Sequence, residues 1–488
     1  MKKQCSLFFL IHYSFFICAQ APSQLTTEIE KLKSDKALQH ATWSVCVMSV
    51  NKDVILAEYN SQTSLVPAST LKLMTTGAAL SMLGSDFTFK TKIQYDGTFD
   101  SVSGVLRGNL YITGGGDPTI DSKYFKDKND TTSATDKWAL LLKKKGLKIV
   151  EGAVIADATI FEDNIIPPQW IWADMGNYFG AGACGLSYHD NSYSVFFNSG
   201  NAGSNTTIGK TEPVIEGLQL INKVTAAGKI DSAFIYGSLY TYYRTIEGTI
   251  PANKTNYIVE GSIPDPALFC AQAFEKSLKG IGVKIQQKAT TVRCLKEEGK
   301  YVLLAKDTLH THYSPTLEKI VYWTNTKSIN LYAEHLLKYI AYAKTGYGKE
   351  EKGIEAVVEF WKDRGVDVGG LIMNDGCGLS RANVITTKTQ VQALRKMYLD
   401  KNSKAFFNSL PVAGKGGSLG NLCEGTIAEN NLCAKSGYIT GARGYAGYVK
   451  NKKGEMLCFS VLANNYECTP TEMKKKLEKI LVAIAELE

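Results

Sequence analysis

Histidine is scarce in this sequence, with only six among 488 residues. The last of them, His335, precedes the Gly-x-Ser-x-Gly pattern at residues 416–420. A nucleophile elbow of the α/β-hydrolase type needs its histidine downstream of the serine, so that class of serine hydrolase is excluded. If a serine is the nucleophile, its base must be another residue type.

Metal-ligand and dinucleotide patterns are also missing. The eleven cysteines include no Cys-x-x-Cys pair, which excludes a zinc knuckle and a thioredoxin-like site. His310-Thr311-His312 has no acidic or cysteine ligand at a helpful spacing, and we interpret it as a solvated loop. The Gly-x-Gly-x-x-Gly pattern at 180–185 lacks the preceding strand and following helix of a dinucleotide site. We therefore predict no metal and no cofactor.

A strong excess of charge is absent as well. The chain has 55 Lys and Arg against 47 Asp and Glu, a formal net charge of +8, and its lysines are scattered. A nucleic-acid interface would concentrate positive charge on one face, so we predict no nucleic-acid partner.

Long apolar runs are absent after the first twenty residues. Two lysines precede an apolar stretch at residues 7–17, and small residues follow it. This order is typical of a secretory signal peptide, which we place at residues 1–20. It predicts export to the periplasm or cell envelope, with no stable membrane span. An N-terminal membrane anchor, lipidation at Cys18 and the pairing of the nine remaining cysteines stay open.

Apolar periodicity predicts helices and strands near both ends of the chain. The predicted helices cover residues 26–38, 69–83, 266–279, 328–343, 353–364 and 470–487. The predicted strands cover residues 42–50, 54–59 and 455–463.

The middle of the chain has a different sequence pattern. Short strand-like pieces there alternate with Gly, Asn, Asp and Ser turns. The predicted fold class is therefore α/β (α+β), with one domain split in sequence into residues 21–86 and 267–488. Residues 87–266 are predicted to form a β-rich insertion of one or two smaller domains.

Ser69-Thr70-Leu71-Lys72 supplies a base for a serine nucleophile. Positions three apart on a helix share one face, so the Lys72 amine can reach the Ser69 hydroxyl. Free N–H groups at a helix start favour the negative charge that develops on such a serine. A lysine accepts a proton only when burial or a nearby cation lowers its pKa. A second cation is therefore expected nearby.

Two further motifs strengthen this reading, because a lone Ser-x-x-Lys occurs by chance on the order of once or twice in a chain of this length. Ser328-Ile329-Asn330 opens a predicted helix and supplies a hydroxyl and an amide. Lys435-Ser436-Gly437 precedes a strand-like run at residues 438–449 and supplies a cation. A second Lys-Thr-Gly, at 344–346, has no strand after it and is interpreted as a helix end.

The ordered set Ser-x-x-Lys, Ser-x-Asn and Lys-[Ser/Thr]-Gly resembles the signature of penicillin-binding proteins and serine β-lactamases. The 259 residues between Ser69 and Ser328 are similar to the spacing in class C low-molecular-mass penicillin-binding proteins, which are D-alanyl-D-alanine carboxypeptidases and endopeptidases. Further stretches that resemble this family lie at residues 114–119, 178–182, 328–334, 375–381 and 410–414. The resemblance implies a serine β-lactamase/transpeptidase-like catalytic domain.

Carried over to this chain, the resemblance implies five roles. Ser69 would be the acylated nucleophile and Lys72 its general base. Ser328 would relay a proton to the leaving amine, and Asn330 would hold Lys72 and the substrate amide. Lys435 would attract the terminal carboxylate of the substrate and depress the Lys72 pKa.

Ser436, Gly437 and Tyr438 would bind the substrate, and the N–H groups of Ser69 and Tyr438 would form the oxyanion hole. The chain departs from the family pattern at three positions. Ser436 replaces the commoner threonine, and Tyr438 stands where a small hydroxyl residue is usual. Cys377 replaces a usual serine, and we interpret it as an inert buried thiol.

The function that the resemblance implies is a secreted serine-type D-Ala-D-Ala carboxypeptidase. Its expected partners are peptidoglycan stem peptides and β-lactams, and penicillin would acylate it. The alternatives are a serine β-lactamase and a non-catalytic sensor of β-lactam or peptidoglycan. The balance between carboxypeptidase and endopeptidase activity stays open, as does the formation of a homodimer.

Overall fold

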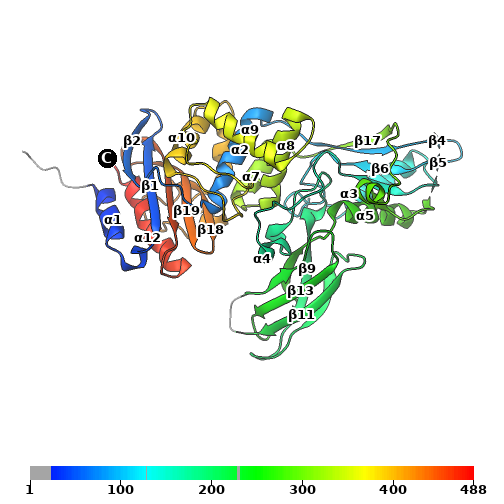
Figure 1. Cartoon of the computed structure of the whole chain (residues 1–488), viewed down its shortest axis with the longest axis horizontal. Coiled ribbons are helices and arrows are strands. Elements are labelled where there is room, and N and C mark those ends of the chain that lie inside the picture. The colour runs from blue at the N-terminus through cyan, green and yellow to red at the C-terminus, as the bar shows by residue number, and fades with distance from the viewer. Residues whose placement is uncertain (1–22, 128, 228–230) are drawn as a thin grey trace, which may run out of the picture.

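The computed structural model describes residues 23–127, 129–227 and 231–488. The predicted signal peptide, residues 1–20, lies outside the described residues. Figure 1 shows two bodies side by side. The blue N-terminal and the yellow-to-red C-terminal segments form one body, and the cyan and green middle of the chain forms the other.

A five-stranded antiparallel sheet joins the two ends of the chain. Its order is β18-β19-β20-β1-β2. The strands are β1 (Thr42–Ser49), β2 (Val54–Tyr59), β18 (Cys433–Ile439), β19 (Ala442–Lys450) and β20 (Met456–Asn464). β1 pairs with β20 over its whole length, from Thr42 opposite Asn464 to Ser49 opposite Leu457. This ladder closes the domain across the inserted segment.

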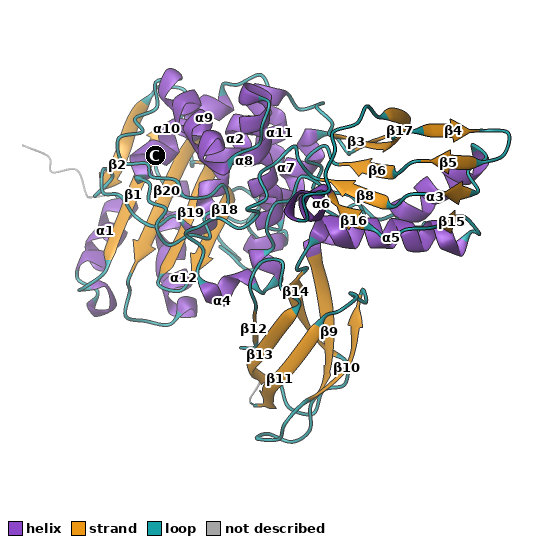
Figure 2. Cartoon of the chain, turned by 45° about the vertical axis from the view of Figure 1, so that its right-hand side comes forward, coloured by secondary structure: helices purple, strands orange, loops and turns teal. Residues whose placement is uncertain are grey.

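Successive side chains of β1 enter opposite faces of this sheet. Val45 and Val47 pack with α1 (Gln24–Lys33) and α12 (Pro470–Ala485) on one face. Cys46 and Met48 lie in the larger core on the other face, which includes α2 (Lys72–Leu83) and α10 (Thr387–Tyr398). Figure 2 shows the sheet with helices on both sides. The β1 strand therefore reads as a continuous buried run instead of an alternating one.

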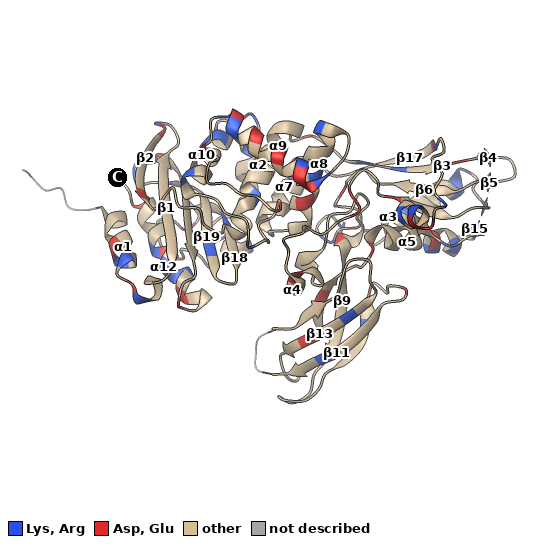
Figure 3. Ribbon diagram, in the orientation of Figure 1, with Lys and Arg blue, Asp and Glu red and all other residues tan. Residues whose placement is uncertain are grey.

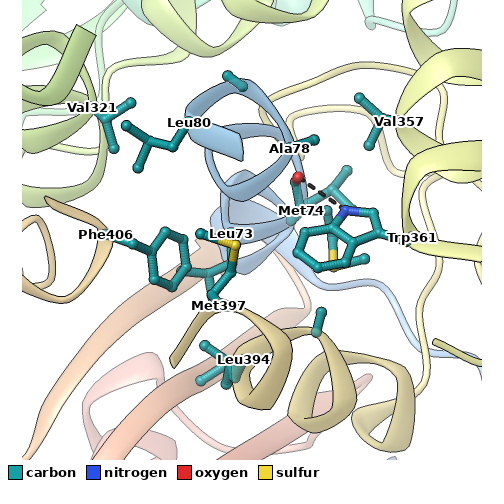
Figure 4. Close-up of a cluster of buried hydrophobic side chains, with 14 of the residues drawn as sticks. Leu73, Met74, Ala78, Leu80, Val321, Val357, Trp361, Leu394, Met397 and Phe406 are labelled. Atoms are coloured by element: carbon teal, nitrogen blue, oxygen red, sulfur yellow. Dashed lines mark hydrogen bonds between the residues drawn. The ribbon is translucent and has the colours of Figure 1, made fainter. Parts of the chain in front are cut away.

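Helix α2 is the central helix of this body. Its residues 72–80 are all buried, as expected for a helix that is covered on every side. Figure 4 shows Leu73, Met74 and Leu80 among side chains of neighbouring helices, and Trp361 donates its indole N–H to the Met74 carbonyl at 3.1 Å. The surrounding helices are α7 (Leu317–Thr326), α8 (Asn330–Thr345), α9 (Glu350–Asp363) and α11 (Ser403–Asn408).

The inserted region forms two β-rich lobes (Figure 2). The first holds the sheets β16-β8-β6-β3-β17 and β15-β7-β5-β4. Its strands are β3 (Lys90–Tyr95), β4 (Thr98–Asp100), β5 (Val105–Arg107), β6 (Leu110–Thr113), β7 (Ile149–Val150), β8 (Val154–Asp157), β15 (Lys284–Ile285), β16 (Thr290–Thr291) and β17 (Asp307–Tyr313). Helices α3 (Ala134–Lys144), α5 (Pro266–Gly280) and α6 (Val292–Glu297) pack against these sheets.

The second lobe holds two three-stranded sheets, β10-β9-β14 and β11-β13-β12. Its strands are β9 (Ser192–Asn198), β10 (Thr207–Glu212), β11 (Gln219–Ala226), β12 (Phe234–Tyr236), β13 (Tyr243–Ile250) and β14 (Tyr257–Ser262). The short helix α4 (Trp172–Met175) contacts β12 and lies between this lobe and the body that contains the five-stranded sheet.

The first lobe includes strands that follow residue 266 in the sequence. β17 pairs antiparallel with β3, while β15 and β16 pair in parallel with β7 and β8. Helix α5 buries Phe274 and Leu278 in the same lobe. We therefore propose that the insertion spans residues 87–313, instead of ending at 266. The boundary drawn from the sequence followed the return of helical periodicity, which does not reveal which core a helix joins.

His310 and His312 lie in β17, so the interpretation as a solvated loop is wrong. His312 packs edge-on against Trp138 of α3, with ring centroids 5.5 Å apart. Burial lowers the pKa of His312 to about 4. The Thr-His alternation belongs to a strand with one face on a helix, and that pattern is hard to distinguish from a polar loop in sequence.

Most predicted elements are found within a few residues of their expected bounds, including α5, α8, α9 and α12. The segment predicted as one helix at 69–83 begins with a 3₁₀ turn at Ala68–Leu71. Lys435-Ser436-Gly437 lies inside β18 and does not precede a strand. A turn at residues 440–441 divides the predicted run into β18 and β19, because Gly441 adopts φ +81°.

Among the described residues, no helix has both the length and the apolar content needed to cross a bilayer. Lys and Arg are mixed with Asp and Glu over both bodies of the molecule (Figure 3).

We expect Thr469→Ala to lower the free energy of unfolding by about 1 kcal/mol. Thr469 accepts the backbone N–H of Glu472 at the start of α12, and the Glu472 carboxylate accepts the N–H of Thr469 in return. Urea unfolding monitored by circular dichroism measures the change. Thr469→Ser keeps the cap and is the control. Equal losses in the two variants would contradict the capping role.

Candidate active site

Ser69 lies in the 3₁₀ turn Ala68–Leu71 that leads into α2. Ala68 adopts φ +47°, a left-handed conformation that is uncommon for a residue with a side chain. Two glycines of other segments pack closely against the backbone of this turn. A Cβ at Gly378 would lie 1.9 Å from the Ala68 carbonyl oxygen, and one at Gly437 would lie 2.5 Å from the Pro67 carbonyl oxygen. The turn is therefore clamped between the 375–380 loop and β18, with Ser69 half-buried.

The Lys72 amine is fully buried and contacts three oxygens. Its Nζ lies 3.0 Å from the Ser69 Oγ, 2.6 Å from the Asn330 Oδ1 and 2.8 Å from the carbonyl oxygen of Cys377. The Asn330 amide N–H donates to the Phe179 carbonyl at 2.8 Å, which turns its Oδ1 toward the lysine. Two distant parts of the chain, at Asn330 and Cys377, thus meet Ser69 at one amine.

Burial lowers the pKa of Lys72, and the nearby Cys377, Asp375 and Glu334 side chains oppose this shift. Lys435 is fully buried as well, and its Nζ donates to the Ser436 carbonyl at 2.7 Å. Burial lowers the pKa of Lys435 far below its usual value, and the charge on Lys72 lowers it further. Two buried amines that repel each other favour a state in which one of them is neutral.

Ser328 lies in the turn between α7 and α8, two residues before Asn330. It adopts φ +59° and is half-buried. The following N–H, of Ile329, donates to the Thr324 carbonyl at 3.1 Å, which ties the turn to the end of α7. The structure thus holds Ser328 beside the start of α8, from which Asn330 reaches Lys72.

β18 brings the third motif to the same turn. Lys435 and Gly437 are buried, Ser436 is half-buried, and Tyr438 is 50% exposed. Gly437 approaches the Pro67 carbonyl closely, so a side chain there would push the strand away from Ser69. The Tyr438 ring lies 5.3 Å from the Arg443 guanidinium.

Asp375 and Glu334 belong to the site although the sequence motifs did not select them. Asp375 accepts the N–H groups of Gly378 and Ser380 at 2.7 and 2.6 Å, and also the Trp170 indole and the Asn383 amide at 2.9 and 2.8 Å. These bonds shape the loop that carries the Cys377 carbonyl. The signal in the sequence was the Asp-Gly-x-Gly stretch, which was recognised only as a resemblance.

Glu334, Asp375 and Cys377 present possible ligand atoms within 4.8 Å of one another. The two oxygens of Asp375 already accept four N–H donors, and those of Glu334 accept the Gly376 N–H. A metal ion would have to displace these donors beside a buried lysine, so the three groups do not fit a metal centre. We interpret them as a hydrogen-bonded cluster that supports the loop.

The family model described as D-Ala-D-Ala carboxypeptidase 3 (S13) matches residues 25–486. A D-alanyl-D-alanine carboxypeptidase of Actinomadura sp. (strain R39) is 29% identical over 462 residues, which cover 91% of this chain and 81% of that protein. The D-alanyl-D-alanine carboxypeptidase DacB of Haemophilus influenzae is 24% identical over 440 residues, covering 88% of this chain and 86% of that protein.

The crystal structure of penicillin-binding protein 4 (dacB) from Haemophilus influenzae superimposes with a TM-score of 0.78. The match covers 95% of this chain and 99% of that chain at 22% sequence identity. The predicted fold class, an α/β domain of the serine β-lactamase/transpeptidase type that is split by a β-rich insertion, is thereby confirmed.

We expect Gly378→Ala to destabilise the protein more than Gly346→Ala. Both glycines have positive φ, +84° and +78°, so both substitutions cost about 1 kcal/mol in backbone strain. Only at Gly378 does the new Cβ also meet a backbone oxygen, 1.9 Å away, whereas nothing lies within 4 Å of it at Gly346. Denaturant unfolding of the two variants measures the difference. Equal destabilisation would show that the 375–380 loop does not clamp the Ser69 turn.

Proposed function

Because the chain belongs to the D-Ala-D-Ala carboxypeptidase 3 (S13) family and is a serine-type carboxypeptidase, we propose that it cleaves peptidoglycan stem peptides through an acyl-enzyme on Ser69. The single observation that supports this most strongly is the set of three oxygens around the Lys72 amine. It gives the amine the hydrogen-bond partners that a general base needs.

The number of protons on the Lys72 amine matches its three partners in either protonation state. A neutral amine has two N–H groups and one lone pair. The Asn330 Oδ1 and the Cys377 carbonyl oxygen only accept hydrogen bonds, so they take the two N–H groups. The lone pair then points at the Ser69 Oγ, 3.0 Å away, and accepts the hydroxyl proton. A charged lysine fits the same three oxygens as a triple donor, so the site holds both protonation states without rearrangement.

The proposed reaction proceeds in two halves. As Ser69 loses its proton to Lys72, its Oγ attacks the carbonyl carbon of the penultimate D-alanine, and the N–H groups of Ser69 and Tyr438 bind the resulting oxyanion. The C–N bond then breaks, and the leaving D-alanine amine takes, through Ser328, the proton that Lys72 had accepted. In the second half water attacks the ester, Lys72 accepts the proton of the water, and this proton passes to the Ser69 Oγ as the ester bond breaks.

Substrate binding is assigned to β18. Lys435, Ser436 and Gly437 run along the edge of the Ser69 turn. Of the two buried amines, Lys435 is proposed to be the charged one while Lys72 is neutral, and its positive potential attracts the terminal carboxylate of the stem peptide. The exposed Tyr438 side chain leaves recognition at that position to its backbone. The protein is proposed to act in the cell envelope after removal of residues 1–20, and to be acylated by penicillin.

We expect a Ser69→Ala variant to form no adduct with penicillin, while the mature protein gains the mass of one penicilloyl group. In parallel, only the mature protein should release D-alanine from a stem pentapeptide. Intact-mass spectrometry and a D-alanine assay are the measurements. An adduct without D-alanine release would favour the sensor alternative, and an adduct in the variant would contradict the assignment of Ser69. A cross-linked muropeptide dimer as a second substrate tests endopeptidase activity.

We expect Lys72→Arg to slow acylation by about 10²–10⁴-fold, because arginine cannot act as a general base near neutral pH. In the unsubstituted enzyme, burial lowers the Lys72 pKa, so the acylation rate should rise with pH and level off below the ordinary lysine value of about 10.4. Stopped-flow acylation across pH measures both effects. Lys344→Arg, at the exposed Lys-Thr-Gly of α8, is the control and should be unchanged. A Lys72→Arg variant with an unaltered rate would exclude Lys72 as the base.

A further inference from the structure

The carbonyl oxygen of Cys377 accepts a hydrogen bond from the Lys72 amine at 2.8 Å, and the hydrogen bonds of the neighbouring residue Gly376 fix its position. Glu334 extends from α8 and accepts the N–H of Gly376 through both carboxyl oxygens, at 2.9 and 3.1 Å. The carbonyl of the same residue lies in the next peptide unit, and it accepts a hydrogen bond from the Thr75 hydroxyl of α2 at 2.7 Å. The residue before Cys377 is therefore pinned between two helices.

Glu334 and Asp375 are both fully buried, and they differ in their hydrogen bonds. Asp375 accepts four N–H donors, which stabilise a negative charge. Glu334 accepts the single N–H of Gly376 and the thiol of Cys377. Two carboxyl groups this close to each other cannot both be charged at low cost. The proton belongs on the one with fewer donors, which is Glu334.

The charged and titratable groups around Glu334 come from several elements. Asp375 and Cys377 face it from the loop, Lys72 lies on α2, and Glu350 lies on α9. Burial raises the pKa of Glu334 to about 8, and the negative charges of Asp375 and Glu350 act in the same direction. The hydrogen bonds from Cys377 and Gly376 oppose the shift without cancelling it.

We propose that Glu334 is a positioning residue for Lys72: as an uncharged carboxylic acid it holds Gly376 so that the Cys377 carbonyl meets the amine, and it leaves Asp375 as the charged member of the pair of carboxyl groups. The proposal rests on the proposed function, since it concerns the base that activates Ser69. When Glu334 and Lys72 share one proton, a charged Glu334 leaves that proton on Lys72. A protonated Lys72 cannot accept a proton from Ser69.

The first test compares Glu334→Gln with Glu334→Ala in penicillin acylation from pH 6 to 9. Glutamine keeps a carbonyl oxygen for the Gly376 N–H and cannot take a charge, so the acylation rate of Glu334→Gln should stay within threefold of the unsubstituted rate at pH 7. At pH 8–9 the variant should be faster than the unsubstituted enzyme, because it cannot form the inactive state in which Glu334 is charged and Lys72 protonated. Alanine removes the acceptor, so acylation should fall at least tenfold at every pH.

Two outcomes overturn the proposal. If Glu334→Gln is as slow as Glu334→Ala, the charged form of Glu334 is the one required. If Glu334→Ala acylates at the normal rate, Glu334 does not position the loop. Rescue by the conservative variant, together with the changed pH profile, separates this role from a general loss of stability.

A second measurement tests the proton on Glu334 without using activity. A carboxyl group whose folded-state pKa lies near 8 keeps its proton while the unfolded chain loses it above about 4.3. Its contribution to stability is therefore full below about 4.3 and is lost as the pH rises toward 8. Glutamine does not titrate, so Tm of Glu334→Gln minus Tm of the unsubstituted protein should become more positive between pH 5 and 8. A constant or falling difference overturns the uncharged state.

Glu28→Gln is the matched control for the thermal measurement. Glu28 is also a buried carboxyl on a helix, but it is ion-paired with Lys31 at 2.6 Å. Its substitution should lower Tm, without a gain toward pH 8. If the unsubstituted protein forms no penicilloyl adduct, the proposed function fails, while the thermal comparison still decides the state of Glu334.

Discussion

The chemistry that we propose for this protein depends on the burial of one amine, that of Lys72. Lys72 has no contact with solvent, and every hydrogen-bond partner it has is an oxygen supplied by the fold. Desolvation makes the charged form costly, and the carbonyl groups around it keep that form available. Such a balance requires each acceptor to be placed within a few tenths of an ångström, which explains why so many elements converge on the first turn of α2.

The inserted region takes part in this placement. Phe179 orients Asn330 through its carbonyl, and the Trp170 indole N–H binds Asp375. Both residues lie close to α4 in sequence, in the segment between β8 of the first lobe and β9 of the second. A loop from the insertion and a loop after α9 therefore support the same lysine from two sides, and the site belongs to both bodies of the molecule.

Local signals in the sequence were sufficient for several elements. Thr469-Pro470 and Glu472 predicted the start of α12, because the hydrogen bonds of a capping box join residues within one helical turn. The left-handed Gly346 ended α8 as expected for a helix C-cap. Non-local pairing was different. The sequence placed residues 267–313 with the split domain, whereas β17 pairs with β3 and α5 packs in the first lobe. Periodicity shows that a segment has an apolar face without showing which core receives it.

The sequence by itself determined the residue types, order and spacing of the three motifs, and through them the family. Only the tertiary structure decided how the motifs meet. Ser69 and Lys72 are neighbours along the chain, so their contact follows from helical geometry. The contacts of Lys72 with Asn330 and Cys377 span 258 and 305 residues, and the proton on Glu334 depends on burial beside Asp375. Packing alone sets these distances and the degree of desolvation, and both are physical quantities that no sequence pattern contains.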